Sequence, residues 1–300
     1  MMHSQSATAP SLEGQVHLVT GATSGIGRAT ARALAQRGAL VVVCGRDRGK
    51  AVETVATLRA ETGNPAVDYL LADLSIQAEV RTLAQQVQQR YQRLDVLVNN
   101  AGTFQLRRRV SEDGIEMTWA VNMLAPFLLS NLLLDALRAS APARVVNVTS
   151  RMHQSVPFDL DDVQLAKEYS GQRAYGASKR AVVSFTYELA RRLAGSGVTA
   201  NVLHPGFAAT SMGLGDGLLG KVIRPLMRLV ADSPAEAART SVYLAASPEV
   251  AGVTGTYFVD CEPADSAPQT CDEEVAARLW DLCAEMTGLK IHPAADKDQP

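Results

Sequence analysis

Short apolar runs alternate with longer segments of helical pattern along most of the chain. Seven runs have the length of buried strands, at residues 16–20, 40–44, 67–71, 96–98, 144–148, 199–203 and 256–259. The segments between them, such as 28–37, 50–61 and 79–91, are rich in helix-forming residues. Strands that alternate with helices predict right-handed βαβ units. We therefore predict an α/β fold, with a doubly wound Rossmann-type parallel sheet of about seven strands and helices on both faces.

No break in composition divides this alternation. We predict a single domain over residues 12–290, with flexible ends at 1–11 and 291–300. No run of about 20 apolar residues occurs, so no membrane span is expected. The net charge is −2, and the arginine cluster at 107–109 is typical of a solvated loop, so nucleic acid is not an expected partner.

The chain contains four cysteines, Cys44, Cys261, Cys271 and Cys283. They form no C-x-x-C pair, and no His-x-x-x-His lies nearby. We therefore expect neither a metal site nor a disulfide framework, and a reducing, cytoplasmic location fits this pattern.

A glycine-rich turn follows the first predicted strand and precedes the first predicted helix. Such a turn points backbone N–H groups and a helix N-terminus at one spot, which favours an anion such as a pyrophosphate. The glycines stand at the first, fifth and seventh places, unlike the G-x-G-x-x-G spacing of the best-known dinucleotide fingerprint. A purely structural turn is the alternative. The candidate phosphate-binding residues are Gly21, Thr23, Ser24, Gly25, Ile26 and Gly27.

Tyr175 and Lys179 are spaced to share one face of a predicted helix, one turn apart. A free tyrosine phenol has a pKa of about 10, and an adjacent ammonium group lowers the pKa of such a phenol. The pair could therefore act as a general acid/base. This spacing also arises by chance on solvated helix faces, so the rest of the chain has to decide.

The other candidate residues follow the ends of predicted strands. Ligands of open α/β sheets bind at the carboxyl ends of the strands. The glycine turn, Asp73, the run Asn99–Gly102, Ser150 and Pro205-Gly206 all come directly after such ends. We therefore expect one ligand site at this edge of the sheet.

In their order, these residues resemble the short-chain dehydrogenase/reductase family. The matching motifs are Thr20-Gly21-x-x-x-Gly25-x-Gly27, Asn99-Asn100-Ala101-Gly102, Ser150, Tyr175-x-x-x-Lys179 and Pro205-Gly206, across residues 12–260. The segments 146–150, 158–160, 252–260 and 279–282 are similar to the retinol dehydrogenase and WW-domain oxidoreductase branch. The resemblance implies a single-domain oxidoreductase that uses a nicotinamide cofactor.

The resemblance also implies a catalytic tetrad of Asn122, Ser150, Tyr175 and Lys179. Tyr175 would exchange a proton with the substrate oxygen, and Ser150 would donate a hydrogen bond to that oxygen. Lys179 would lower the pKa of Tyr175 and hold the nicotinamide ribose, while Asn122 would hold a water that links Lys179 to solvent. Alternatively, Asn122 is a polar helix residue and Ser150 caps a strand end.

Cofactor choice depends on the end of the second strand. Gly45 stands where many NAD users have an acidic residue, and Arg46 after it could pair with a 2′-phosphate. NADP(H) is therefore favoured and NAD(H) is possible. By resemblance, the further cofactor contacts are Asp73, Leu74, Asn100, Ala101, Gly102, Tyr175, Lys179, Pro205, Gly206 and Thr210.

Residues 207–232 lie where this family keeps its substrate lid. Apolar residues recur there at helical spacing, which fits a packed helix, a lid over a lipophilic substrate, or a contact with a membrane surface. The expected partner is a small, lipophilic alcohol, ketone or aldehyde. The family also implies a homodimer or homotetramer that pairs the helices at 127–137 and 182–193.

Three functions are weighed against each other. The first is an NADP-dependent alcohol dehydrogenase or carbonyl reductase. The second is a non-catalytic regulatory protein that binds the nucleotide, which the complete Tyr175, Lys179 and Ser150 set disfavours. The third is a nucleotide-sugar epimerase or dehydratase, whose usual C-terminal substrate domain finds no room here.

Overall fold

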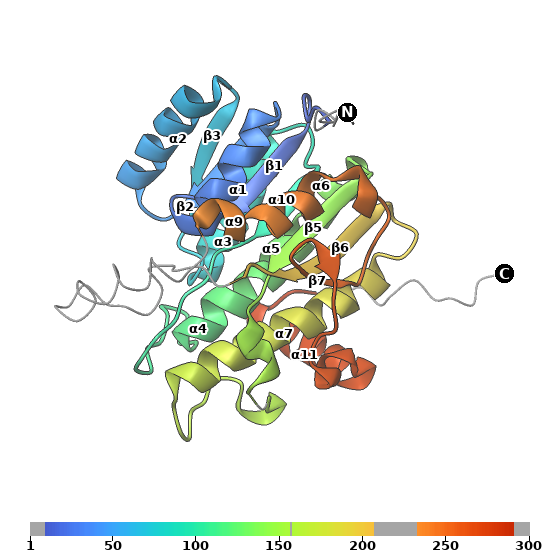
Figure 1. The fold of residues 1–300 in the computed structure, drawn as a ribbon. Coiled ribbons are helices and arrows are strands. Elements are labelled where there is room, and N and C mark those ends of the chain that lie inside the picture. Colours follow the sequence, from blue (N-terminus) through green and yellow to red (C-terminus); the bar gives the residue numbers. More distant parts are fainter. Residues whose placement is uncertain (1–9, 157, 207–232, 291–300) are drawn as a thin grey trace.

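A single twisted sheet forms the centre of the molecule (Figure 1). The computed structural model describes residues 10–156, 158–206 and 233–290. Within them the strand order is β3-β2-β1-β4-β5-β6-β7-β8. The strands are β1 (Val16–Thr20), β2 (Leu40–Gly45), β3 (Val67–Leu71), β4 (Val96–Asn99), β5 (Ala143–Val148), β6 (Val198–His204), β7 (Tyr257–Val259) and β8 (Glu262–Pro263).

The first seven strands run parallel, as the alternating pattern predicts. Strand β8 is an addition of two residues that pairs antiparallel with β7. The doubly wound α/β fold is therefore confirmed, with one more strand than expected. Strand β1 lies between β2 and β4, so the order of the sheet reverses beside the glycine turn.

Helices cover both faces of this sheet (Figure 1). Side chains of β1 alternate between the two layers, with Leu18 in the core under α3, α5, α7 and α11, and Val19 in the core under α1, α2 and α10. The helices are α1 (Gly25–Gln36), α2 (Arg48–Thr62), α3 (Gln77–Arg90), α4 (Met117–Trp119), α5 (Ala125–Leu132), α6 (Leu134–Ala139), α7 (Gly171–Arg192), α9 (Pro234–Ala237), α10 (Arg239–Ala246) and α11 (Glu273–Thr287).

The C-terminal helix α11 packs on α7 and α5. The ring centroid of Trp280 on α11 lies 5.0 Å from that of Phe127 and 5.8 Å from that of Phe185, and the guanidinium of Arg192 lies 4.3 Å from the Trp280 ring. Only Asp135 in segment 127–137 and Arg191 in segment 182–193 are exposed. Most apolar side chains of these two segments therefore pack within the chain, and the expected subunit contact stays a prediction.

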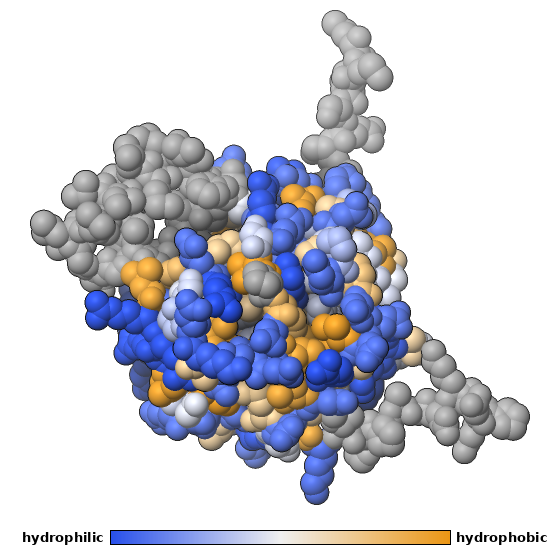
Figure 2. Space-filling view, turned by 90° about the horizontal axis from the view of Figure 1, so that it is seen from below, coloured by the Kyte–Doolittle hydropathy of each residue, from blue (hydrophilic) through white to orange (hydrophobic). Residues whose placement is uncertain are grey.

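Two other expectations concern residues that the structure does not describe. The lid at 207–232 and the cofactor contact at Thr210 lie outside them. In the part that the structure describes, no helix is long and apolar enough to cross a membrane. The face seen in Figure 2 carries mostly hydrophilic side chains with smaller apolar areas between them.

Candidate active site

The glycine turn joins β1 to α1 and packs tightly against the end of β4. Gly21 and Gly25 have positive φ angles of 64° and 55°, which side chains disfavour. A Cβ atom on Gly21 would lie 2.8 Å from the Cα of Ala101, and one on Gly27 would meet Asn100. Gly21 and Gly27 thus let the Asn99–Gly102 segment approach the turn, and the turn leaves a backbone surface beside the start of α1.

The N-terminus of α1 differs from those of α2 and α3. Asp47 caps α2 by accepting a hydrogen bond from Lys50 N at 3.0 Å, and Asp113 accepts one from Gln77 N, the first residue of α3, at 2.8 Å. In α1, Ser24 makes no side-chain cap within the described chain, and the first turn has no acidic residue. The free N–H groups and the helix dipole therefore favour an anion there, which fits a dinucleotide phosphate.

The end of β2 explains why no acidic side chain stands there. A Cβ atom on Gly45 would lie 2.6 Å from Thr23 Cγ2, so a larger residue would displace the glycine turn. The next residue, Arg46, has a side chain that is 77% exposed and lies 3.8 Å from the Asp73 carboxylate. Because Asp47 caps α2, Arg46 rather than Asp47 is the residue directly after β2 whose charge remains open to a ligand.

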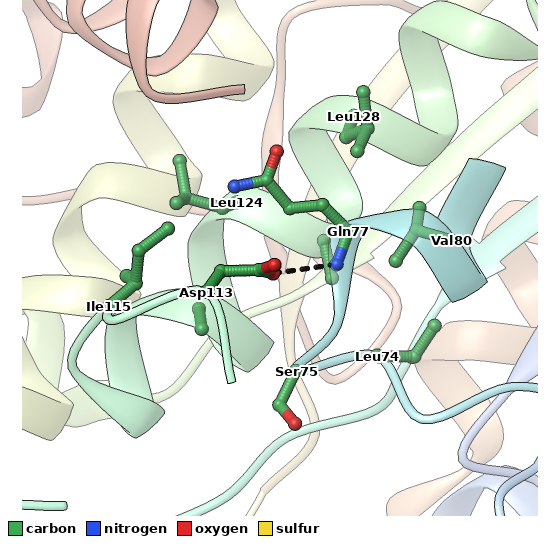
Figure 3. A pocket seen from close by; sticks show the side chains of 10 residues that line it. Leu74, Ser75, Gln77, Val80, Asp113, Ile115, Leu124 and Leu128 are labelled. Atoms are coloured by element: carbon green, nitrogen blue, oxygen red, sulfur yellow. Dashed lines mark hydrogen bonds between the residues drawn. The ribbon is translucent and has the colours of Figure 1, made fainter. Parts of the chain in front are cut away.

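Asp73 and Leu74 follow β3, but their side chains already have structural roles. Asp73 accepts hydrogen bonds from both N and Oγ of Ser75. Leu74 lines a small cavity of about 10 Å³ with Val80 and Leu128 (Figure 3). The structure therefore places both residues at the expected edge and gives Leu74 a packing role that the motif did not suggest.

Side-chain hydrogen bonds connect the ends of β1 and β4. Asn100 donates from Nδ2 to Thr20 O at 2.8 Å, and Thr20 Oγ1 accepts from the backbone N of Asn100 and Ala101. Asn99 donates from Nδ2 to Asn147 Oδ1 on β5 at 2.8 Å, which extends the connection to the next strand. These bonds fix the spacing between the glycine turn and the residues after β5.

Ser150, Tyr175 and Lys179 come together at the end of β5. Lys179 is 3% exposed, and its Nζ donates to Val148 O at 2.9 Å and lies 5.8 Å from the ring centroid of Tyr175. The Ser150 side chain lies near enough to the Tyr175 phenol to act on its pKa. A phenol, a hydroxyl and a buried amine thus occupy one place on the carboxyl edge.

The acidity of Tyr175 differs from the expectation. Burial raises the pKa of Tyr175, and the hydrogen bond with Ser150 opposes that rise without cancelling it. Burial also lowers the pKa of Lys179 to about 8. The predicted lowering of the Tyr175 pKa by Lys179 is therefore wrong for the protein alone, because loss of hydration outweighs an ammonium 5.8 Å from the ring.

Asn122 lies in a single π-helical turn, Ala120–Leu124, between α4 and α5. It is 1% exposed and holds the backbone of Thr103 from both sides, accepting from Thr103 N at 2.7 Å and donating to Thr103 O at 3.0 Å. It also donates to Ser178 Oγ at 3.0 Å. Asn122 therefore couples the loop after β4 to the helix that carries Tyr175 and Lys179.

Three comparisons with known proteins place the chain in a family. The short chain dehydrogenase family matches residues 15–215. Human retinol dehydrogenase 14 is 43% identical, over 93% of this chain and 88% of its own length. Human retinol dehydrogenase 13 is 41% identical, over 96% of this chain and 89% of its own length.

The chain is a short-chain dehydrogenase/reductase. It belongs to the retinol dehydrogenase branch, as the motifs predict, and is an NAD(P)-dependent oxidoreductase. Solved structures agree. An uncharacterized protein from Mycobacterium paratuberculosis has a TM-score of 0.76 at 30% identity, covering 94% of this chain and 96% of that chain. An NADP complex of Pseudomonas aeruginosa RhlG has a TM-score of 0.66 at 32% identity, covering 83% and 95%.

Several residues that shape the site of this dehydrogenase were missed by the motifs. The Phe104 ring meets the Tyr175 ring edge-on at 5.7 Å. Gly171 and Gly176 lie on either side of Tyr175 in α7. A Cβ atom on Gly171 would meet Gln105, and one on Gly176 would lie 2.8 Å from the Val156 Cβ. Gly176 stands in a helix interior, where glycine is disfavoured, and this is the sequence signal that could have indicated the close approach.

Pro205 and Gly206 end the described part of the site at β6. Gly206 has a positive φ angle of 78°, so the chain turns sharply there. Both stand on the carboxyl edge directly after His204, the last residue of β6. The candidate residues from Gly21 to Gly206 therefore share one edge of the sheet, and Thr210 alone among them is not described.

Proposed function

We propose that this enzyme transfers a hydride between NADP(H) and a lipophilic alcohol/carbonyl pair, with Tyr175 as general acid/base. The observation that carries the proposal is that Tyr175 and the buried Lys179 lie together beside Ser150, on the edge that also carries the open N-terminus of α1. Bound NADP(H) supplies or accepts the hydride, and the protein provides orientation and proton transfer.

The protonation states favour carbonyl reduction near neutral pH. Because burial raises the pKa of Tyr175, the phenol holds its proton there and can give it to a carbonyl oxygen. Ser150 donates a hydrogen bond to the same oxygen as negative charge develops on it. Lys179, held against Val148 O, places a positive charge beside the phenolate that is left. Asn122 keeps the Thr103 backbone and α7 in register around this group.

We assign the cofactor contacts by charge and by shape. The turn from Gly21 to Gly27, with Thr23, Ser24, Gly25 and Ile26, would hold the phosphates, and Arg46 would pair with the 2′-phosphate of NADP. Asp73, Leu74 and Asn100–Gly102 would lie along the adenosine. Tyr175, Lys179, Pro205, Gly206 and Thr210 would lie along the nicotinamide half.

The lipophilic substrate class rests on the walls of the site. Phe104 packs on Tyr175, and Val156 lies against Gly176, the residue that follows Tyr175. Relatives named for lipophilic alcohols support this class, among them the human polyprenol dehydrogenase, which is 38% identical over 92% of this chain. The suitable first probes are therefore all-trans-retinal and decanal, a retinoid and a non-retinoid aldehyde.

The first experiment tests the chemistry. We expect Tyr175→Phe to lower the NADPH-dependent reduction of both probes by about 10² to 10⁴-fold, the usual contribution of a general acid/base. Tyr243→Phe, a change on α10 remote from the site, is the matched control and should leave turnover intact. Turnover in Tyr175→Phe within threefold of wild type would overturn the proposal.

The second experiment tests the cofactor. Fluorescence titration should give tighter binding of NADPH than of NADH. Arg46→Ala should weaken NADPH by roughly tenfold or more, since a hydrogen bond between charged groups contributes about 1.5–3 kcal/mol, and should leave NADH unchanged. Arg48→Ala, also exposed, is the control. Equal loss for both cofactors, or an NADH preference in wild type, would contradict the assignment of Arg46.

A further inference from the structure

His153 forms a buried connection between Ser150 and the C-terminal part of the chain. Its ring is fully buried, with Nδ1 2.7 Å from Ser150 O. Its other nitrogen, Nε2, accepts a hydrogen bond from Ala267 N at 3.2 Å. The ring also meets that of Tyr257 edge-on at 5.1 Å. Residues 114 positions apart in sequence thus meet at one imidazole beside the proposed catalytic serine.

The two contacts allow one protonation state of the imidazole. A backbone N–H can only donate, so Nε2 carries no proton. The proton therefore lies on Nδ1 and is donated to Ser150 O. Burial lowers the pKa of His153, and the nearby charge of Arg180 adds to this, so the ring stays neutral. A neutral imidazole with a fixed tautomer orients whatever it holds.

Ser150 depends on this contact more than its neighbours do. Lys179 Nζ holds Val148 O at 2.9 Å, and Thr149 Oγ1 donates to Lys179 O at 2.6 Å. Ser150 is the next residue, and its hydroxyl has only a long 3.4 Å hydrogen bond from Met152 N within its own turn. Ser150 O accepts from the backbone N of His153 at 3.0 Å and from its ring Nδ1 at 2.7 Å. The ring bond is the shorter of the two contacts that fix the serine backbone and, through it, the direction of the hydroxyl.

The imidazole itself is anchored from two sides. Arg180 on α7 donates to His153 O at 2.8 Å and to Gln154 O at 3.3 Å. On the other side, Thr270 Oγ1 donates to Ala267 O at 2.6 Å, in the short helical turn that leads to α11. Rotation of the His153 ring would break both of its hydrogen bonds in a buried site, where unpaired polar groups are costly. The ring is therefore a rigid support.

We propose that His153 is a positioning residue for the reaction, which holds the Ser150 hydroxyl against Tyr175 by linking Ser150 O to Ala267 N. The inference rests on the proposed function. It makes α11 and the segment before it part of the catalytic framework, although no residue of that segment contacts the substrate oxygen.

Two substitutions separate the contacts of His153. His153→Gln can still accept from Ala267 N but loses the donor to Ser150, whereas His153→Asn can keep the donor and loses the anchor. We expect each to lower kcat for decanal or retinal reduction by about tenfold, as misplacement at a reacting centre does, with the NADPH Kd within twofold of wild type. His17→Gln, a fully buried histidine at the other edge of the sheet, is the control and should keep kcat.

A double-mutant cycle distinguishes positioning from general damage. If His153 acts through Ser150, His153→Gln should have almost no further effect on kcat in a Ser150→Ala background. An equal tenfold loss in that background would overturn the proposal, as would a single variant with the kcat of wild type. If instead Tyr175→Phe retains full activity, the proposed function fails. That outcome is distinguishable from a failure of the His153 proposal, which the double-mutant cycle tests separately.

A measurement without turnover tests the same contact. In protein labelled with ¹⁵N-histidine, the His153 signal, identified by its loss in His153→Gln, should report the neutral Nδ1–H form. A signal from the Nε2–H form or from an imidazolium at neutral pH would overturn the proposal even if neither aldehyde is reduced.

Discussion

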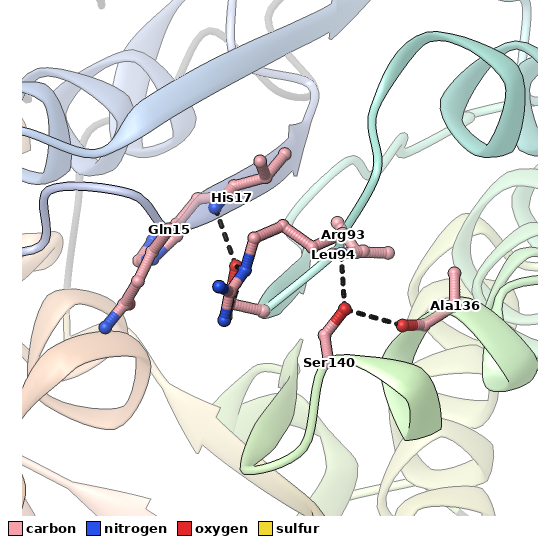
Figure 4. A network of polar contacts seen from close by, with 8 residues as sticks. Gln15, His17, Arg93, Leu94, Ala136 and Ser140 are labelled. Atoms are coloured by element: carbon pink, nitrogen blue, oxygen red, sulfur yellow. Dashed lines mark hydrogen bonds and ion pairs between the residues drawn. The ribbon is translucent and has the colours of Figure 1, made fainter.

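The amino ends of the strands form one edge of the sheet, and their carboxyl ends form the other. Both edges bury polar groups, but the partners of these groups differ. At the amino edge, the Asp95 carboxylate accepts from Val16 N at 2.8 Å and pairs at 2.6 Å with Arg93, which Figure 4 shows near His17. At the carboxyl edge, no carboxylate among the described residues forms an ion pair with the buried Lys179. The amino edge neutralises its charge, whereas the carboxyl edge keeps a cation whose hydrogen-bond acceptor within the described part of the chain is a carbonyl oxygen.

This difference indicates which edge is optimised for stability and which for chemistry. A buried charge with an incomplete partner set destabilises the fold and is retained where function needs it. The sheet therefore concentrates its stabilising polar contacts at one edge and its reactive groups at the other. Substitutions at the two edges should separate activity from stability.

The largest effect is expected for Lys179→Met. Turnover of NADPH with either aldehyde should fall about a hundredfold or more, because the positive charge beside the phenolate is lost. The free energy of unfolding should stay the same or rise, since a buried amine without a carboxylate partner is replaced by an apolar side chain. Lys50→Met, an exposed change on α2, is the control. A large loss of stability with near-normal turnover would reverse the roles of the two edges.

The second prediction concerns pH at the amino edge. Burial lowers the pKa of His17 to about 4 from 6.5, so the unfolded chain binds the proton first as pH falls. The contribution of the neutral His17 to the free energy of unfolding is therefore fully present above pH 6.5 and is lost as the pH falls toward 4. The loss amounts to about 3 kcal/mol, since a pKa difference of one unit corresponds to ~1.4 kcal/mol. Denaturant unfolding between pH 7 and 4 should show a shallower loss in His17→Gln than in wild type. Parallel curves for the two proteins would contradict this account.

Asp95→Asn should lower stability by roughly 2 kcal/mol, because it weakens the acceptor for Val16 N and the pair with Arg93. Turnover per folded molecule should not change. Asp135→Asn, with a side chain that is 92% exposed, is the control and should shift stability by less than about 0.5 kcal/mol. A change in kcat for Asp95→Asn would show that the edges are coupled.

The smallest effect is expected for Asp47→Ala. Loss of the cap on α2 should reduce stability by about 1 kcal/mol. NADPH binding should change less than twofold, because the Asp47 carboxylate is occupied by Lys50 N rather than by the ribose. A clear gain in NADH or NADPH affinity would mean that Asp47 faces the cofactor. The assignment of Asp47 as a helix cap and of Arg46 as the cofactor contact would then be wrong.

Sequence reasoning predicted the elements that long patterns define. Seven apolar runs became the parallel strands, because most of them are buried on both faces and need continuous apolar residues, while β3 at the edge of the sheet is only partly buried. It missed β8, a two-residue strand that follows a turn at Asp260 and Cys261, both with positive φ. It also predicted one helix over 127–137, where the structure has α5 and α6 with a break at Leu133.

The site was predictable where residue type and order carry the chemistry. The motifs brought Ser150, Tyr175 and Lys179 to one place, and the comparisons confirm the family. The acidity of Tyr175 could not be predicted, because burial depends on Phe104 and other residues that arrive from distant segments. The position of His153 could not be predicted either, since its partner Ala267 is far away in sequence.

The most direct test of the account follows the hydride and the proton donor together. NADPH that carries deuterium at both C4 positions is mixed with decanal and either wild type or Tyr175→Phe, and the alcohol is analysed by mass spectrometry. The account predicts decanol heavier by one deuterium from wild type and almost none from Tyr175→Phe in the same time. Unlabelled alcohol from wild type, or equal labelled alcohol from both proteins, would contradict it.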